Sequence, residues 1–239
     1  MDKRSSDTRQ ISPIAYIENC FSAKFGIPRQ SGRAPGILSR IVFLPEYRNP
    51  DALRGMEGYS HLWLIFGFSE SVREEFSPTV RPPRLGGNRR VGVFASRSPF
   101  RPNSIGLSSV RLERIEYGDE GPVPVVSGAD LMNGTPIYDI KPYIPSSDSH
   151  PDAAGGYSAD FTDYRLSVSD PGGFLENLPG EIKSAAYECI SDDPRPSYQD
   201  DPERVYTMTL GNYDISFRVS GTDAVITRTE TLNERKKNN

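Results

Sequence analysis

The sequence predicts a mainly β protein that consists of a large N-terminal domain of short strands and a small α+β C-terminal domain. Glycine and proline each occur 21 times among 239 residues, which favours turns and short strands over long helices. The chain becomes small and polar between His150 and Asp163, and a helical period appears only beyond that stretch. We therefore expect a β domain at 1–150, a linker or loop at 151–173 and the small domain at 174–239.

Six apolar segments define the expected strands of the first domain. The segment Ser60–Phe68 is almost continuously apolar and predicts a central buried strand with Trp63 in the core. His61, at its start, is expected to be a hydrogen-bonded structural residue because no second histidine or nearby cysteine supports a site. The other expected strands are Pro13–Glu18, Ser39–Leu44, Val91–Ala95, Ile105–Tyr117 and Val123–Leu131.

The apolar positions of Ile105–Tyr117 do not keep one parity. They change from odd to even numbers after Leu107 and return to odd numbers after Leu112. Shifts of this kind indicate bulges, which curved sheets and barrels use. The pair Asn133-Gly134, further along the chain, is a strong turn signal.

The C-terminal domain is expected to contain one helix and three strands. Glu181–Ile190 places apolar residues at i, i+3, i+4, i+7 and i+8, which is one face of a helix. Cys189 lies on that face, and we expect it to pack rather than to react. The three short strands expected after the helix are Val205–Leu210, Ile215–Val219 and Ala224–Arg228.

Composition and missing motifs exclude several classes of function. The two cysteines, Cys20 and Cys189, form no CxxC pair, so neither a disulfide framework nor a zinc or metal site is expected. The N-terminus has no apolar signal region, and no run is long enough to cross a membrane, so we expect a cytoplasmic protein. The GxGxxG, GxxxxGK[ST], zinc-deaminase and GxSxG patterns are all missing.

One stretch, Arg81–Ser109, carries six arginines and no acid, although the whole chain has a formal net charge of −4. Its four prolines stiffen the backbone, and Gly86-Gly87 permits a turn. Guanidinium groups on a stiff loop suit planar anions such as phosphate or carboxylate. The alternative is that these arginines are separate partners for surface acids. We favour an anion-binding surface because no local counter-charge accompanies them.

Several long sequence blocks resemble one known family, the TsaA-like or TrmO methyltransferases. The blocks are PRQSG (28–32), YSHLW (59–63), RPPRLGGN (81–88), GVFASRSPFRPNSIGLS (92–108) and NGTPIYDIKPY (133–143). The C-terminal DPRPSY (193–198), followed by three strands, is similar to the small appended domain of bacterial members. The resemblance covers nearly the whole chain.

The resemblance implies a fold, a reaction and partners. The main domain would be a single-sheet β-barrel that acts as a homodimer, with the active site near the subunit interface. The protein would use S-adenosylmethionine to methylate N6 of threonylcarbamoyladenosine at tRNA position 37, next to the anticodon. Asn133 stands where many relatives have an acidic residue, so this chain departs from the family pattern at that position.

The cofactor requires a pocket for adenine and a grip on a zwitterionic methionine end. The polar loop at 28–30 and the backbone of the turn at 131–134 can supply these, and Arg97 can pair with a carboxylate. Ser69-Glu70 follows an apolar strand, where a ligand pocket could begin. The expected cofactor-binding residues are Pro28, Arg29, Gln30, Ser69, Glu70, Arg97, Leu107, Leu131, Met132, Asn133 and Gly134.

The acceptor nitrogen is a poor nucleophile until its proton leaves, because its lone pair is delocalised. Asp139 is the candidate base, and Lys141 on the same face would orient it or stabilise charge. Two alternatives stay open: water takes the proton, or the two residues form a structural ion pair. The expected RNA-binding residues are Arg84, Arg89, Arg90, Arg101 and Asn103.

Two other functions are compatible with these residues. A non-catalytic regulator on the same scaffold would bind nucleic acid in a salt-sensitive way and would not bind the cofactor. A small-molecule methyltransferase would bind the cofactor without depending on tRNA.

Overall fold

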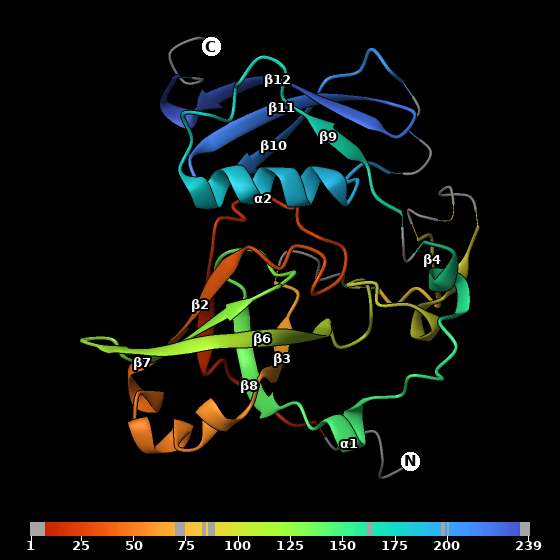
Figure 1. The fold of residues 1–239 in the computed structure, drawn as a ribbon. Coiled ribbons are helices and arrows are strands. Elements are labelled where there is room, and N and C mark those ends of the chain that lie inside the picture. Colours follow the sequence, from red (N-terminus) through yellow and green to blue (C-terminus); the bar gives the residue numbers. More distant parts are fainter. Residues whose placement is uncertain are drawn as a thin grey trace.

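The computed structural model describes residues 8–69, 75–82, 85, 89–161, 164–196, 199 and 201–234. Two sheets lie one above the other in Figure 1, and helix α2 (Gly180–Ser191) lies between them. A two-stranded sheet pairs β4 (Thr79–Val80) with β5 (Val91–Gly92) at one side of the molecule. No helix among the described residues is long and apolar enough to span a bilayer.

Six antiparallel strands form the first sheet, and each strand pairs with two neighbours. Because β8 pairs back with β1, the hydrogen-bonded order is closed. The expected mainly β class is thereby confirmed. Three short 3-10 helices, η2 (Pro45–Tyr47), η3 (Pro50–Leu53) and η4 (Met56–Gly58), connect β2 to β3. The order is β1 (Ala15–Glu18), β2 (Leu38–Phe43), β7 (Gly121–Ser127), β6 (Ile105–Gly118), β3 (His61–Gly67) and β8 (Pro136–Pro142).

Strand β3 is central, as expected, but its faces differ. Leu62, Leu64 and Phe66 point inward and are at most 4% exposed. The expectation that Trp63 lies in the core is wrong, because it lies half-buried on the outer face. There its indole Nε1 donates to Asp148 Oδ2 at 3.1 Å. Successive side chains of a strand alternate between faces, and a continuous apolar run hides that alternation.

The parity shifts in β6 have two different causes. A register shift between Leu112 and Arg114 is the bulge that the second parity shift predicted. The first shift is not a bulge, because Gly106, Ser108 and Val110 continue one buried face without interruption. The apolar side chains of Ile105 and Leu107 instead point outward and are 37% and 51% exposed.

The expected strand Val91–Ala95 is largely wrong. Only Val91 and Gly92 pair as a strand, and they pair with β4 outside the six-stranded sheet. The remaining three residues form the 3-10 helix η6 (Val93–Ala95). Its described partner, β4, is only two residues long, and the apolar residues after Gly92 close a turn instead of extending a ladder.

The helix and three strands expected in the C-terminal part are confirmed. A four-stranded sheet has the order β10 (Tyr206–Leu210), β11 (Tyr213–Ser220), β12 (Asp223–Thr231) and β9 (Ser167–Ser169). Strand β9 pairs in parallel with β12, although it lies within the range expected to be a linker. The connection before it also holds the short helices α1 (Pro145–Asp148) and η7 (Gly156–Phe161).

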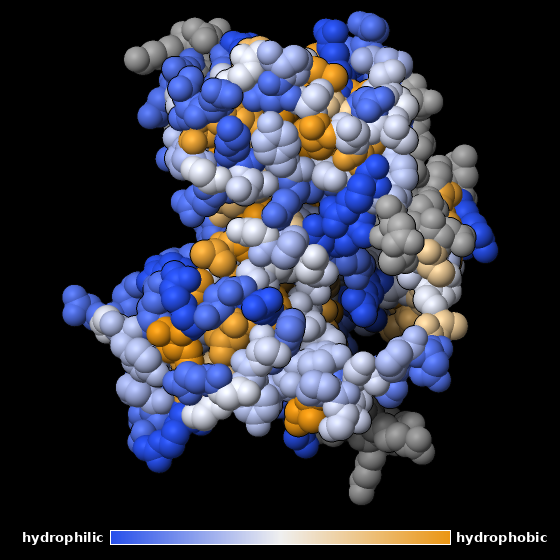
Figure 2. All heavy atoms as spheres, in the orientation of Figure 1, coloured by the Kyte–Doolittle hydropathy of each residue, from blue (hydrophilic) through white to orange (hydrophobic). Residues whose placement is uncertain are grey.

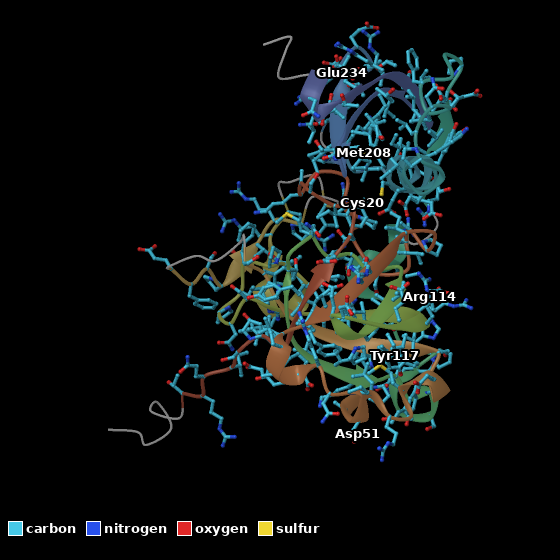
Figure 3. The ribbon with its side chains drawn as sticks, turned by 90° about the vertical axis from the view of Figure 1, so that its left-hand side faces the viewer. Cys20, Asp51, Arg114, Tyr117, Met208 and Glu234 are labelled. Atoms are coloured by element: carbon cyan, nitrogen blue, oxygen red, sulfur yellow. The ribbon has the colours of Figure 1, made fainter. Side chains whose placement is uncertain are left out.

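The hydrophobic core between α2 and the second sheet also contains residues from the N-terminal part of the chain. Phe21, Ala34 and Ile37, from the segment between β1 and β2, are buried with the apolar face of α2 and with the second sheet. Figure 3 shows Cys20 of this segment near Met208 of β10, at the junction of the two parts. Burial raises the pKa of Cys20 to about 11 and also raises the pKa of Cys189. Cys189 is buried, as expected for a packing residue, and the raised pKa values disfavour the thiolate of both cysteines.

Candidate functional site

The loop 28–33 is held against the end of β7 by two glycines. Gly32 N donates to the Gly128 carbonyl at 2.8 Å, and both residues have positive φ angles, 77° and 75°. A Cβ on Gly128 would lie 3.1 Å from the Gly32 Cα. Glycine at both positions therefore permits the close approach that brings Gln30 and Ser31 to the first sheet.

Five polar residues from distant parts of the chain meet beside this loop, and we call them the Arg97 cluster: Gln30, Ser31, Arg97, Ser108 and Asp130. Arg97 Nη1 donates to Gln30 Oε1 at 2.9 Å, and buried Ser108 donates to Asp130 Oδ1 at 2.5 Å. Burial raises the pKa of Asp130, and the bonds from Ser108 and the Ser31 amide, with the charge of Arg97, oppose that rise. The cluster thus combines a cation with a half-buried acid whose charge that cation partly compensates.

A hollow of about 450 Å³ opens over Trp63, and we call it the Trp63 hollow. The rings of Trp63 and Tyr143 are 5.5 Å apart and offer aromatic faces. The Ile144 amide and the indole of Trp63 lower the pKa of Asp148, so its carboxylate stays ionised at the rim. The residues that line the hollow are Ser31, His61, Trp63, Arg97, Ser109, Tyr143 and Asp148.

His61 is hydrogen-bonded, as expected from the sequence, and its structural role stays a prediction. Its Nδ1 lies 2.9 Å from Ser60 Oγ, and its ring lies 6.1 Å from the ring of Tyr143. It also lines the Trp63 hollow, so it shapes that surface.

The candidate catalytic pair lies on the same outer face as the Trp63 hollow. Asp139 and Lys141 form an ion pair of 3.0 Å, with side chains 47% and 62% exposed, which confirms that they share one face. Lys141 is the cross-strand neighbour of Trp63, and Asp139 is the neighbour of Ile65. Ile65 in turn pairs with Leu107 of β6, so Leu107 lies in the same row. The pair is therefore next to the hollow and open to a ligand.

The turn at 131–134 uses most of its polar groups within the protein. Leu131 is 2% exposed, and its carbonyl accepts from Asn19 Nδ2 at 2.9 Å. Asn133 Oδ1 accepts from the Asn19 amide at 3.0 Å, and Gly134 N donates to the Ile17 carbonyl at 2.8 Å. The Met132 carbonyl accepts from Thr135. The turn therefore stabilises the end of β1 and supports the preceding residue, Asp130.

Asp130 is the residue that sequence reasoning missed. It comes directly after the buried run 122–129, where an acid is costly unless it is compensated. That placement was a readable signal, because a charged residue that ends a buried strand needs partners. The sequence did not identify its partners, because Ser108, Arg97 and Ser31 are distant from Asp130 along the chain.

A second and larger cavity, of about 1770 Å³, lies between the segment 75–102 and the connection 154–158, and we call it the basic cleft. In Figure 1 these two segments, yellow and green to teal, lie side by side near β4. Figure 2 shows strongly hydrophilic residues gathered between the two parts of the molecule. Glu75 is the one acid among the described residues that line the cleft. The cations that line it are Lys24, Arg29, Arg33, Arg81, Arg90, Arg97 and Arg101.

The expected site residues are only partly brought together. Arg97 lines both cavities, and Leu107 lies in the strand row beside the Trp63 hollow, whereas Gln30, Arg90 and Arg101 line the basic cleft. Arg29 also lines the cleft, but it donates to the Asp193 carbonyl at 3.2 Å and to the Arg195 carbonyl. The structure places buried Pro28 and exposed Ser69, Arg89 and Asn103 outside the linings of both cavities. Glu70 and Arg84 lie outside the described residues.

The described residues thus form a closed six-stranded sheet with a small hollow on its outer face and a larger cleft lined by cations. Comparison with known proteins identifies the family. The N-terminal domain of tRNA-methyltransferase O matches residues 16–149, and the TrmO C-terminal domain matches residues 174–232. The chain belongs to the tRNA-methyltransferase O family.

Relatives and solved structures agree with this assignment. The tRNA (adenine(37)-N6)-methyltransferase of Escherichia coli is 37% identical over 88% of this chain and 93% of its own length. The protein of the same name from Eikenella corrodens is 46% identical over 70% of this chain and 95% of its own. A crystal structure of TrmO from P. aeruginosa has a TM-score of 0.77 at 32% identity and covers 94% of this chain and 97% of its own.

Proposed function

We propose that this chain is an S-adenosylmethionine-dependent tRNA methyltransferase that acts on N6 of adenine 37, and that the acceptor is threonylcarbamoyladenosine. The observation that carries the residue assignments is the position of Arg97. Among the described residues, Arg97 alone lines both the Trp63 hollow and the basic cleft. We place the cofactor in the hollow and the tRNA in the cleft, so that methyl donor and acceptor meet at Arg97.

The Trp63 hollow and the Arg97 cluster fit this cofactor chemically. The hollow's volume of about 450 Å³ falls within the usual range of small-ligand sites. Aromatic faces suit a purine or a sulfonium, and Arg97 suits a carboxylate. Asp148 at the rim carries negative charge for an ammonium group. When bound, the cofactor supplies a methyl group on a positively charged sulfur.

The reaction forms a bond between the methyl carbon and N6, breaks the bond between that carbon and sulfur, and releases the N6 proton. Asp139 would accept the proton, directly or through water, because it lies on the outer face beside the hollow. Lys141, 3.0 Å from Asp139, would orient the carboxylate or stabilise developing charge. Arg90 and Arg101 in the cleft would hold RNA phosphates.

The finer expectations about fold, assembly and location are part of the same proposal. The closed order of the six strands supports the single-sheet β-barrel, and the two family matches support domains near 1–150 and 174–239. Ile105 and Leu107 expose apolar surface on β6, next to the proposed cofactor site, which supports a homodimer that covers this face. We place the enzyme in the cytoplasm, where its tRNA substrate is made.

Mass spectrometry of nucleosides tests the function directly. Transfer RNA carrying threonylcarbamoyladenosine, incubated with the protein and S-adenosylmethionine, should yield a nucleoside heavier by one methyl group. Asp139→Asn should lower kcat by roughly 10²–10⁴-fold, the usual contribution of a general base, with tRNA affinity unchanged. Lys141→Gln, which removes its partner and leaves the base, should have a smaller effect.

Other outcomes would lead to different conclusions. Cofactor binding without methylated tRNA would indicate a different acceptor. Loss of both product and cofactor binding would favour a non-catalytic regulator. A normal kcat in Asp139→Asn would assign the proton to water.

A further inference from the structure

Three phenylalanines line the basic cleft with much of their side chains in solvent. Phe76 is 59%, Phe94 is 76% and Phe100 is 38% exposed. All three belong to the segment 75–102, which also supplies most of the arginines of the cleft. Large exposed apolar side chains gathered in one place mark a surface that binds something, because leaving them in water forfeits the gain from burial.

Short backbone contacts hold these rings on a stiff base. The Val93 amide donates to the Pro78 carbonyl at 3.0 Å, which ties the segment of Phe76 to that of Phe94. Ser98 Oγ accepts from the Phe100 amide at 3.3 Å, and Arg101 donates back to the Ser96 carbonyl at 3.3 Å. Rings that are already ordered lose less entropy when a partner stacks on them.

The charge around the rings identifies the partner. Arg90 donates to Thr79 Oγ1 at 2.9 Å, and Arg101 donates to a backbone carbonyl, so neither is paired with an acid among the described residues. A second copy of this chain that presented the same surface would bring like charges together. A single-stranded nucleic acid instead offers phosphates for the arginines and unpaired base faces for the rings.

We propose that Phe76, Phe94 and Phe100 form a stacking platform for unpaired bases of the anticodon loop. This inference rests on the proposed function, because position 37 lies in that loop. The arginines bind the backbone, and the rings hold the bases that flank the methyl acceptor. The platform therefore distinguishes a single-stranded loop from a duplex of equal charge.

Paired binding measurements test the platform. The probes are an RNA hairpin with the anticodon loop and the same RNA annealed to a complementary strand that pairs every loop base. Phe94→Ala should weaken hairpin binding at least fivefold, as expected for loss of one stacked base, and should leave duplex binding unchanged. Arg90→Ala should weaken both probes and lower the slope of log affinity against log salt by about 0.7–0.9.

Phe174→Ala is the matched control. The exposed fraction of Phe174, 37%, is nearly the same as that of Phe100, but Phe174 lies in the C-terminal part and does not line the cleft. It should bind both probes as the unchanged protein does. Methyl transfer by the unchanged protein is measured in parallel. A protein that binds the hairpin but transfers no methyl group would contradict the proposed function without contradicting the stacking platform. If Phe94→Ala and Phe100→Ala keep hairpin affinity, or lose hairpin and duplex equally, the platform is wrong. A change of oligomeric mass in either variant would instead assign the rings to a contact between subunits and overturn the proposal.

Discussion

Two acids from different parts of the chain meet the same loop, residues 28–33, in different ways. Asp192, after α2, has a side chain that is 3% exposed. It lies 2.6 Å from Arg33 Nε and 3.7 Å from Arg165 Nη1, and accepts from the Arg29 amide at 3.3 Å. Asp130, after β7, accepts from Ser108 and lies near one arginine, Arg97, and burial raises its pKa.

The comparison indicates what each acid does. Two guanidinium groups and an amide compensate Asp192, so it fastens the loop to the C-terminal domain. Asp130 is less well compensated, because burial outweighs its hydrogen bonds. A half-buried acid with a raised pKa, close to a residue that lines two cavities, is typical of a functional site. The C-terminal domain would thus position Gln30 and Ser31 through Asp192. Asp130 would place a negative charge near Ser31 and Arg97.

The largest expected effect is on stability in Asp192→Asn. This change leaves the guanidinium of Arg33, 17% exposed, beside a neutral amide instead of a carboxylate, and should cost about 3 kcal/mol of the free energy of unfolding. Urea unfolding measures the change. Glu203→Gln is the control, because Glu203 is 87% exposed and 3.6 Å from Arg218, and it should change stability by under about 0.5 kcal/mol. Equal effects in the two variants would contradict the fastening role.

A smaller effect is expected on activity in Arg97→Ala. This change removes the cation that both cavities share, and should lower kcat/KM roughly 10–150-fold, the worth of one charged hydrogen bond. Steady-state methyl transfer and cofactor titration measure it. Arg114→Ala is the control, since Arg114 is 53% exposed, pairs with Glu116 and lies at the surface in Figure 3. Unchanged kinetics in Arg97→Ala would show that Arg97 does not take part in methyl transfer, and would contradict the placement of donor and acceptor at this residue.

The smallest effect is on stability, with the opposite sign, in Asp130→Asn. The pKa of Asp130 is raised in the folded protein, so ionisation of Asp130 lowers the free energy of unfolding. This loss of stability is absent below the ordinary pKa of an aspartate, grows as the pH rises above it, and is complete once the pH has passed the folded-state pKa. At neutral pH the variant should therefore melt higher, by about 2–4 °C per kcal/mol removed, while methyl transfer falls. The gain should disappear in acid. A lower melting temperature at neutral pH would make Asp130 a structural acid like Asp192.

Most elements could be read from the sequence because periodicity reports local geometry. The face of Glu181–Ile190 and five of the six strands of the first sheet were predicted within a few residues, and the acid-free Arg stretch predicted a basic surface. The sixth strand, β8 (Pro136–Pro142), was not among the expected strands. The outward positions of Trp63, Ile105 and Leu107 were not readable, since an apolar residue does not reveal by itself which face of the sheet it occupies.

The sequence by itself determined the family, the two-part organisation and the position of the arginine cluster, because long motifs and charge runs are local properties. Only the tertiary structure decided that Arg97 joins two cavities, that Asp130 lies behind it and that Asp192 holds the loop from the other domain. These contacts join residues that are 33 or more positions apart in the sequence, for example Arg97 and Asp130, or Arg33 and Asp192. Their geometry depends on strand register and on packing between the two parts of the chain, which no local pattern records.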